Sequence, residues 1–179
     1  MSNETKTKWI IDPKHSEVQF KVRHLAISNV SGTFKIFQGE VQSEGEDFNN
    51  ASIHFEMDSD SIDTNLPERD SFLKSENFLD VQKFPKLIFD GNLLRKDDNY
   101  HLEGELTIRD TKKAIKMDVE HTGTGMGRFN DYRAGFELNG KINRKDFGLV
   151  FNMVTEAGSL IMGEEIKLHC DIEIIKQAE

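Results

Sequence analysis

The chain has 179 residues, of which 36% are hydrophobic, and its 32 acidic against 23 basic residues give a net charge of -9. This acidic balance excludes nucleic acid and anionic membrane surfaces as main partners, because both require a local excess of Lys and Arg. The single cysteine, Cys170, excludes an intrachain disulfide, and its place on an apolar strand face predicts a buried thiol rather than a reactive one.

The first predicted elements are two strands. Trp9-Ile-Ile begins a short strand that Pro13 ends, since proline lacks the N–H that a strand ladder needs. From 16 to 24, apolar and polar residues alternate, with Phe20 at the centre of the apolar phase. Successive side chains of a strand point to opposite faces, so this segment predicts one buried and one solvated face.

The next strand is predicted over 31–42, with a change of phase inside it. Phe34 and Ile36 share one phase, whereas Phe37 and Val41 share the other. A strand that is apolar in both phases indicates a β-bulge or burial on both faces. A further apolar stripe follows at positions 53, 55 and 57.

The two-residue period stops between 63 and 80, where a short helix is predicted from Pro67 to about Lys74. Asn65 is a candidate N-cap, Pro67 suits the first helical turn, and Glu68 adds an acid to that turn. The segment up to residue 79 is rich in Leu and Phe. We therefore expect a short helical insert around residues 67–79 to cover an edge or an open end of the β-structure.

Five further strands are predicted in the second half of the chain, because their apolar residues alternate with charged ones. They span residues 86–94, 100–109, 113–122, 133–142 and 165–175. The glycine spacing of residues 123–127 predicts a loop after the third of these strands.

This many two-faced strands must curl or stack to bury their apolar faces. The predicted fold class is therefore all-β, a barrel or a sandwich, in a single domain over 9–176 that follows a disordered segment at 1–8. The sequence shows no signal peptide and no membrane-spanning run. We expect a cytoplasmic protein without stable membrane insertion, or a periplasmic one if a leader has been removed.

The histidines and carboxylates form no pattern typical of catalysis or of metal binding. The six histidines lack paired ligand spacing, so no metal site is predicted. His24 continues the apolar phase of its strand, which suits a hydrogen bond to a turn and a place at a cavity mouth equally well. With no nucleophile motif and no cofactor loop, no catalytic residue is assigned.

The aromatic residues are strongly biased toward phenylalanine, with 13 Phe against 2 Tyr and 1 Trp. A wall of phenylalanine rings suits a hydrocarbon guest, but phenylalanine is equally the ordinary material of a protein core. Composition therefore leaves a filled core and a ligand cavity as alternatives.

A series of short motifs runs through nearly the whole chain, from about Trp9 to Ile175. The motifs are Asp12-Pro-Lys-His-Ser16, Val18-x-Phe20-x-Val22-x-His24, Gly32-x-Phe34, Asp63-Thr-Asn65, Glu68-Arg-Asp70, Leu73-Lys-Ser75, Phe78-Leu-Asp80, Phe84-Pro85, Phe89, Gly104-x-Leu-Thr107, Arg133-Ala-Gly-Phe136 and Gly140-Lys-Ile-x-Arg-Lys-Asp-Phe-Gly-Leu149. Each is weak alone, but the order and spacing are specific. The set resembles the YceI-like polyisoprenoid-binding family.

The resemblance implies an extended, lipocalin-like antiparallel barrel of about eight strands with a small helical insert. It also implies a non-enzymatic homodimer that holds a long isoprenoid or fatty-acid-like lipid in an internal apolar tunnel and needs no other cofactor. The residues expected to form the tunnel wall and its polar mouth are Ser16, Val18, Phe20, Val22, His24, Phe34, Ile36, Phe55, Arg69, Phe72, Phe89, Phe136 and Arg144.

Two alternatives and two departures from the family pattern accompany this expectation. A protein-interaction module could use the outer barrel surface, with Phe37 as a first contact, and an enzyme could act on a bound lipid through His24 and Asp146. Phe72 stands where the family commonly has a histidine, which favours a less polar guest near the helical insert. Asp110 stands where a glycine commonly makes a hairpin turn.

Overall fold

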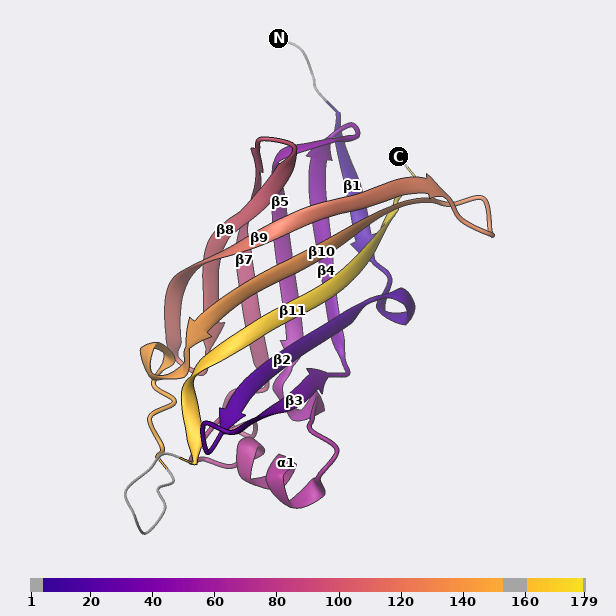
Figure 1. Cartoon of the computed structure of the whole chain (residues 1–179). Helices are drawn as coiled ribbons and strands as arrows, with labels where there is room; N and C mark the ends of the chain where they lie inside the picture. Colours follow the sequence, from indigo (N-terminus) through magenta and orange to yellow (C-terminus); the bar gives the residue numbers. More distant parts are fainter. Residues whose placement is uncertain (1–4, 153–160, 179) are drawn as a thin grey trace.

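The computed structural model describes residues 5–152 and 161–178, and in this part of the chain eleven strands form one antiparallel sheet (Figure 1). The strands are β1 (Lys6–Ile11), β2 (Glu17–His24), β3 (Ser28–Phe34), β4 (Phe37–Glu44), β5 (Asp47–Asp58), β6 (Ile62–Asp63), β7 (Lys86–Lys96), β8 (Asn99–Ile108), β9 (Thr111–Met126), β10 (Tyr132–Asn143) and β11 (Met162–Lys176). One α-helix, α1 (Pro67–Lys74), and three single 3₁₀ turns, η1 (Pro13–His15), η2 (Ser59–Ser61) and η3 (Arg144–Phe147), complete the described elements.

Eight of the strands close into a barrel. Their order around the ring is β1-β4-β5-β7-β8-β9-β10-β11, and β11 pairs again with β1 through Trp9 opposite Lys176 and Ile11 opposite Ile174. Closure lets each strand bury one face in a shared interior, as the alternating sequence requires. This confirms the predicted all-β antiparallel barrel with one short helix.

The remaining strands β2, β3 and β6 continue the sheet from the same edge of β11 that pairs with β1. The break between β1 and β2 is the turn η1, where the carboxylate of Asp12 accepts a hydrogen bond from the Lys14 N–H at 3.0 Å. Pro13 occupies the start of this turn and ends β1, as predicted. The β2–β3 hairpin therefore forms one side of the barrel end that lies near α1 (Figure 1).

The predicted strand over 31–42 is wrong, because it is two strands. β3 ends at Phe34 and β4 begins at Phe37, and both of these rings are buried. The link at residues 35–36 bonds instead to the chain after β5: the Lys35 N–H donates to the Ser61 carbonyl at 3.2 Å. The change of phase thus marks a change of strand rather than a bulge.

The predicted loop at 123–127 is also wrong, because β9 continues to Met126. Its register against β10 shifts by one residue between His121 and Gly123, so Thr122 is the extra residue of a β-bulge. Gly123 has φ of 155° at this point, a backbone angle that residues with a Cβ rarely adopt. The glycines support an irregular long hairpin rather than a loop.

At the N-terminus, β1 begins at Lys6. Residues 6–8 therefore belong to a strand, which corrects that part of the disordered segment expected at 1–8, and residues 1–4 lie outside the described residues.

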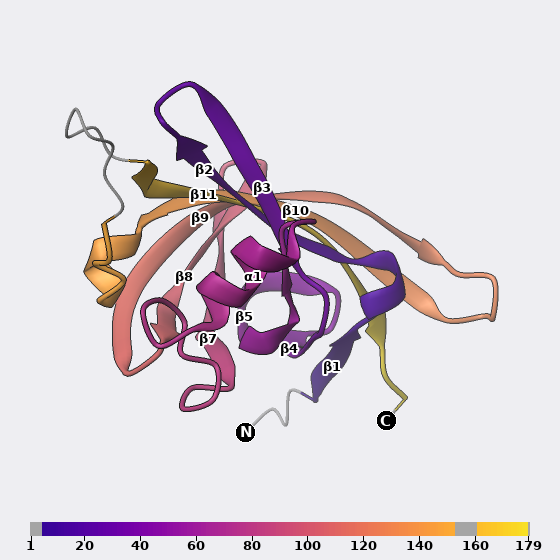
Figure 2. The same cartoon turned by 90° about the horizontal axis from the view of Figure 1, so that it is seen from below.

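Helix α1 lies across one end of the barrel (Figure 2). It spans the predicted Pro67–Lys74, but Leu66 rather than Asn65 is its N-cap, and residues 76–79 form turns rather than more helix. Leu73, Phe78 and Leu79 are buried, which explains the apolar content of the insert. Among residues 5–152 and 161–178, no helix has the length and apolar character needed to span a bilayer.

The seam where the ring closes is bound by an ionic network around Arg133. Its Nη1 donates to Asp12 Oδ2 at 2.7 Å and to Glu173 Oε1 at 2.8 Å, and its Nη2 donates to Asp131 Oδ2 at 2.8 Å. Burial raises the pKa of Asp12, but hydrogen bonds with Arg133, His15 and the Lys14 N–H outweigh burial and lower that pKa to about 2. The network joins η1, β10 and β11.

We expect Asp12→Asn to remove about 2 kcal/mol of unfolding free energy at pH 7, since the folded pKa lies well below the value of about 3.9 for a free Asp. The sign follows from the depressed pKa: the ionised carboxylate stabilises the fold above about pH 4, and this contribution is lost as the pH falls toward 2. Urea unfolding between pH 2 and pH 7 measures it. In Asp12→Asn, the unfolding free energy should fall less steeply than in the parent as the pH is lowered from 4 to 2. The exposed control Asp98→Asn should show the same pH dependence as the parent. An unchanged pH dependence in Asp12→Asn would contradict the assignment.

Candidate functional site

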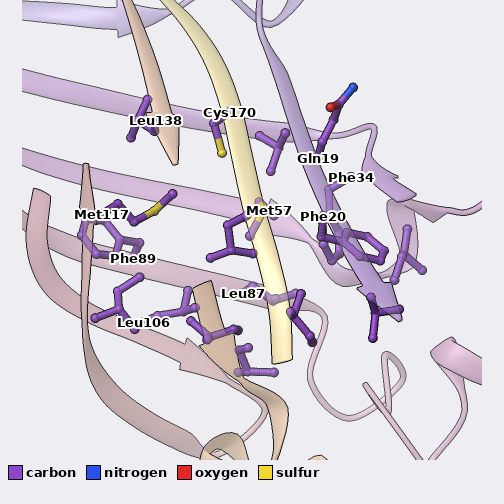
Figure 3. Close-up of a pocket in the computed structure, with 18 of the residues that line it drawn as sticks. Gln19, Phe20, Phe34, Met57, Leu87, Phe89, Leu106, Met117, Leu138 and Cys170 are labelled. Carbon is purple, nitrogen blue, oxygen red and sulfur yellow. The ribbon is translucent and has the colours of Figure 1, made fainter. Parts of the chain in front are cut away.

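A cavity of about 650 Å³ lies inside the barrel, and side chains from most of the strands line it (Figure 3). Figure 3 shows Met57, Leu87, Phe89, Leu106 and Met117 pointing into this space from strands β5, β7, β8 and β9. The volume lies within the range of about 300 to 1,000 Å³ that is usual for small-molecule sites. The interior is therefore a ligand-sized cavity and not a filled core.

The side chains that form the cavity wall alternate along each strand with side chains on the outer surface. In β2, Val18, Phe20 and Val22 line the cavity, whereas Lys21 between them is exposed. The same division holds in β9, where Met117 lines the cavity and Lys116 is exposed. The apolar phase predicted from the sequence therefore faces the cavity, although Gln19 and Arg23 from the other phase of β2 also contribute to its lining.

Most of the predicted site residues come together on this cavity. Those that line it are Val18, Phe20, Val22, His24, Phe34, Phe55, Arg69, Phe72, Phe89 and Phe136. The structure places three others elsewhere, namely Ser16, Ile36 and Arg144.

Ser16 and Ile36 are corrected by local geometry. Ser16 Oγ accepts a hydrogen bond from the Glu173 N–H at 3.0 Å, which places it in the closing seam and away from the cavity. Ile36 lies in the link between β3 and β4 and is 59% exposed. Phe37, proposed as a contact on the outer surface, is buried and packs against Phe55 with ring centroids 5.9 Å apart.

Arg144 is fully buried, but its role is to hold backbone rather than to line the mouth. Its guanidinium donates to the carbonyls of Leu149 at 2.6 Å, Phe151 at 3.1 Å and Gly163 at 2.9 Å, and to Asn152 Oδ1 at 3.0 Å. Burial lowers the pKa of Arg144. The side chain fastens the segment after η3 to the start of β11.

The polar residues of the cavity gather at the end covered by α1. They are Arg23 and His24 at the tip of β2, and Thr64, Glu68 and Arg69 at the start of the helical insert, with Gln19 farther along β2. Sequence reasoning found His24 and Arg69 but missed the rest. The sequence gives one indication of Thr64 and Glu68: both follow residue 63 closely, where the two-residue alternation of the strands stops.

Arg69 is held in position at this mouth by two hydrogen bonds to Thr64. Its Nε donates to Thr64 Oγ1 at 2.7 Å and its Nη2 donates to the Thr64 carbonyl at 2.6 Å. The carboxylate of Asp70 in turn accepts hydrogen bonds from the Thr64 N–H at 2.9 Å and the Thr64 hydroxyl at 2.5 Å. The guanidinium is thus fixed against the cavity by neighbouring polar groups.

An aromatic cluster packs at the opposite end of the cavity, where the Trp9 indole N–H donates to Ser43 Oγ at 2.9 Å. The Trp9 and Phe48 rings have centroids 5.1 Å apart, and Phe48 meets Phe136 edge-on at 5.1 Å. Trp9 and Phe48 are almost entirely buried. The polar lining residues therefore lie mainly at the other end of the cavity, beside α1.

The thiol on the cavity wall is not activated as a nucleophile. Cys170 faces the interior (Figure 3), and burial, with a smaller effect from Asp171, raises its pKa to about 12, so the thiol stays protonated near neutral pH. Asp146 is exposed and does not line the cavity, so the structure does not bring the pair His24 and Asp146 together.

Within residues 5–152 and 161–178, two groups of side chains have the spacing of a metal site, and both lie outside the cavity. Asp12, His15 and Glu173 form one, but Arg133 already donates to both carboxylates. The other consists of Glu137, His169 and Asp171 on β10 and β11, a type of exposed acidic grouping that is common without a metal.

Comparison with known proteins adds three findings. A model of the YceI-like domain matches residues 9–174 of the chain. A UPF0312 protein of Pectobacterium atrosepticum is 32% identical over 165 residues, which cover 92% of this chain and 83% of that relative. The crystal structure of the Campylobacter jejuni YCEI protein has a TM-score of 0.74 and 27% identity, over 89% of this chain and 91% of that one.

The fold also occurs at lower sequence identity. The structure of a polyisoprenoid binding domain from Saccharophagus degradans has a TM-score of 0.68 at 12% identity, over 94% of this chain and 98% of that one. At this identity the likeness shows the fold alone.

Proposed function

Because the chain belongs to the YceI-like domain family, we propose that it binds a long-chain isoprenoid or related lipid in the barrel cavity and stores or carries it unaltered. The observation that carries this proposal is the barrel cavity of about 650 Å³, whose polar lining residues gather mainly at one end. An apolar interior with one polar entrance suits an amphipathic chain that enters tail first. The Saccharophagus degradans domain, which shares the fold and is described as polyisoprenoid-binding, is the reason for choosing an isoprenoid as the guest to test.

The energetics of such a guest favour selection by shape rather than by bulk hydrophobicity. About 20 methylene groups leaving water would contribute roughly 16 kcal/mol, close to the practical ceiling of about 18 to 21 kcal/mol for a non-covalent complex. A lipid in a membrane is already out of water, so transfer to the protein gains little of this sum. Net selectivity then depends on the dimensions of the cavity and on the polar groups at its mouth.

The apolar wall and the protonated thiol of Cys170 both suit sequestration of a lipid. The wall gives a lipid tail apolar neighbours on every side, and the thiol of Cys170, the potential nucleophile on that wall, stays protonated. A bound lipid would thus be shielded from water and left chemically intact. This is the behaviour of a carrier or a store rather than of an enzyme.

We expect natively purified protein, extracted with organic solvent and analysed by mass spectrometry, to release a defined lipid. Protein stripped of lipid should then take up a prenyl lipid such as geranylgeraniol in a binding titration. Met117→Trp, which fills the cavity from β9, should weaken this uptake at least tenfold, while the adjacent outer-face variant Lys116→Trp should leave it unchanged. Empty protein that also takes up no prenyl lipid would overturn the carrier function, and chemically altered lipid after incubation would show catalysis instead.

A further inference from the structure

We propose that the outer rim of the cavity mouth docks on the surface of a lipid bilayer, so that lipid passes between bilayer and cavity without crossing water. The rim consists of four exposed apolar side chains, Ile27, Leu66, Val150 and Phe151. The transfer step rests on the proposed lipid-binding function, to which the rim adds the partner surface.

The rim side chains come from three segments that meet at the α1 end of the barrel (Figure 2). Leu66 precedes α1 and itself lines the cavity. Phe151 follows η3 and packs on the cavity-lining Phe72, with ring centroids 5.2 Å apart. Ile27 is in the turn between β2 and β3, where its N–H donates to the carbonyl of the cavity-lining His24 at 3.0 Å. The exposed apolar surface of the mouth is thus continuous with the cavity wall.

The gathering of these side chains is unusual for this protein. Within residues 5–152 and 161–178, eight large apolar side chains are exposed, and four of them form the rim. Ile27 is 78% exposed and Val150 is 59% exposed. Single apolar side chains on a surface need no explanation, but a group of them around a cavity indicates an interaction site.

The turn that presents Ile27 has a backbone that is unfavourable for its residues. Leu25 and Ala26 have φ of 54° and 55°. Hairpin turns with positive φ at both central residues prefer Asn, Asp and Gly, because a Cβ is strained there. The hairpin turns at the opposite end of the barrel use such residues, with φ of 61° at Gly45 and 54° at Asp97. The apolar tip is therefore kept at the mouth against turn chemistry, which indicates a function for it.

The buried Arg144 holds the second rim segment in its outward position. Its guanidinium donates to the carbonyls of Leu149 at 2.6 Å and Phe151 at 3.1 Å. Val150 lies between these two anchored residues, so its backbone is fixed while its side chain stays exposed. A rim that is already ordered loses little conformational entropy when it docks.

The two ends of the barrel differ in chemistry, and the difference favours a bilayer as the partner of the rim. The far end presents exposed acidic turns at residues 44–47 and 97–98 (Figure 1). The mouth presents the apolar rim, with the exposed Arg23 two residues before the β2–β3 turn. Apolar side chains enter the interface of a bilayer while a neighbouring arginine stays at the level of the lipid phosphates. A lipid that passes through this contact keeps its tail out of water, which removes the hydrophobic cost of transfer.

Sedimentation of the full chain with phosphatidylcholine vesicles tests the docking. The parent should bind the vesicles, and the double variant Ile27→Asp/Val150→Asp should bind them at least 10-fold more weakly, because two carboxylates would have to enter an apolar layer. Neither side chain lines the cavity. The matched control Phe129→Asp changes an 81% exposed apolar side chain between β9 and β10, away from the mouth, and should bind within about twofold of the parent.

A second double variant, Leu25→Asn/Ala26→Gly, tests the turn without adding charge. It supplies the residues that the positive φ angles favour, so the fold should be kept. Vesicle binding should weaken about 3- to 10-fold, because the apolar tip loses the Leu25 side chain. Unchanged vesicle binding would overturn the role of this turn, also where the carboxylate variant does not fold.

Geranylgeraniol delivered from cyclodextrin, without vesicles, separates failure of docking from failure of the proposed function. Every variant should take up this lipid within about twofold of the parent, whereas uptake from vesicles should slow at least 10-fold in Ile27→Asp/Val150→Asp. A parent that takes up lipid from cyclodextrin but does not sediment with vesicles would overturn the docking and leave lipid binding intact.

Three other results are decisive. Vesicle binding that survives in Ile27→Asp/Val150→Asp, or that is lost equally in Phe129→Asp, would show that the rim is not the docking surface. A parent that binds no vesicles but forms a dimer, which the rim variant dissociates in light scattering, would assign the rim to a second copy of the chain. Protein that takes up no lipid from either source would overturn the carrier function, and sedimentation would still decide the docking.

Discussion

Replacing Arg144 by alanine is expected to lower the free energy of unfolding by about 3 to 5 kcal/mol. The side chain is fully buried, and its removal would leave the carbonyls of Leu149, Phe151 and Gly163 without their donor. Each buried polar group that loses its partner costs about 1 to 3 kcal/mol. The loss should concentrate in the attachment of the segment after η3 to β11.

The single tryptophan gives a direct measurement of this change, because Trp9 is completely buried and its fluorescence should report unfolding in urea. Arg128→Ala is the matched control, since Arg128 is exposed beside the exposed ring of Phe129. The control should stay within about 0.5 kcal/mol of the parent. If Arg144→Ala lowered the free energy of unfolding by less than about 1 kcal/mol, water would be replacing the guanidinium as hydrogen-bond donor to these carbonyls.

Phe20→Asp is expected to abolish lipid uptake and to destabilise the fold by about 3 kcal/mol or more. The Phe20 ring lies on the cavity wall, 5.7 Å from the Phe34 ring between centroids, and packs over Gly32 of the neighbouring strand. A carboxylate here would lose this packing and face apolar side chains. Uptake of geranylgeraniol and urea unfolding measure the two effects.

The adjacent residue provides the control for phase. Lys21 is exposed on the outer face of β2, and no ion pair joins it to another described residue. Lys21→Asp introduces the same carboxylate one position away and should change stability by less than about 0.5 kcal/mol. Equal effects of the two variants would show that the inward face of β2 has been assigned to the wrong residues.

The architecture and the wall of the cavity could be predicted because a single physical rule governs both. A strand with one buried face needs a period of two, and the stripes through Phe20, Met117 and Phe136 obey that period in the structure. The rule identifies an enclosure and the residues that face it. The class of guest came from the order of the family motifs, since alternation is the same for a filled barrel and a hollow one.

The errors occur where contacts between distant parts of the chain decide the structure. Ile36 shares a phase with Phe34, but the link at 35–36 turns toward Ser61, and this contact has no local signature. Arg144 was expected at the tunnel mouth, but its guanidinium donates to the carbonyl of Gly163, 19 residues away, and no local pattern indicates this contact. Arg69 came instead from the family resemblance, whose motifs include Glu68-Arg-Asp70, and it lies within α1.

Two of the stretches with an unpaired side in the described part of the chain lie on β3 and β9. Residues 28–32 of β3 pair with β2 alone, and residues 120–126 of β9 pair with β10 alone. An unpaired strand edge is a template on which other chains can aggregate. The first edge, Ser28-Asn-Val-Ser-Gly32, is rich in Ser with one Asn and one Gly, and the second, Glu120-His-Thr-Gly-Thr-Gly-Met126, alternates Thr with Gly. Glycine and asparagine are unfavourable in strands, so Asn29, Gly32, Gly123 and Gly125 disfavour the addition of a further strand at these two edges.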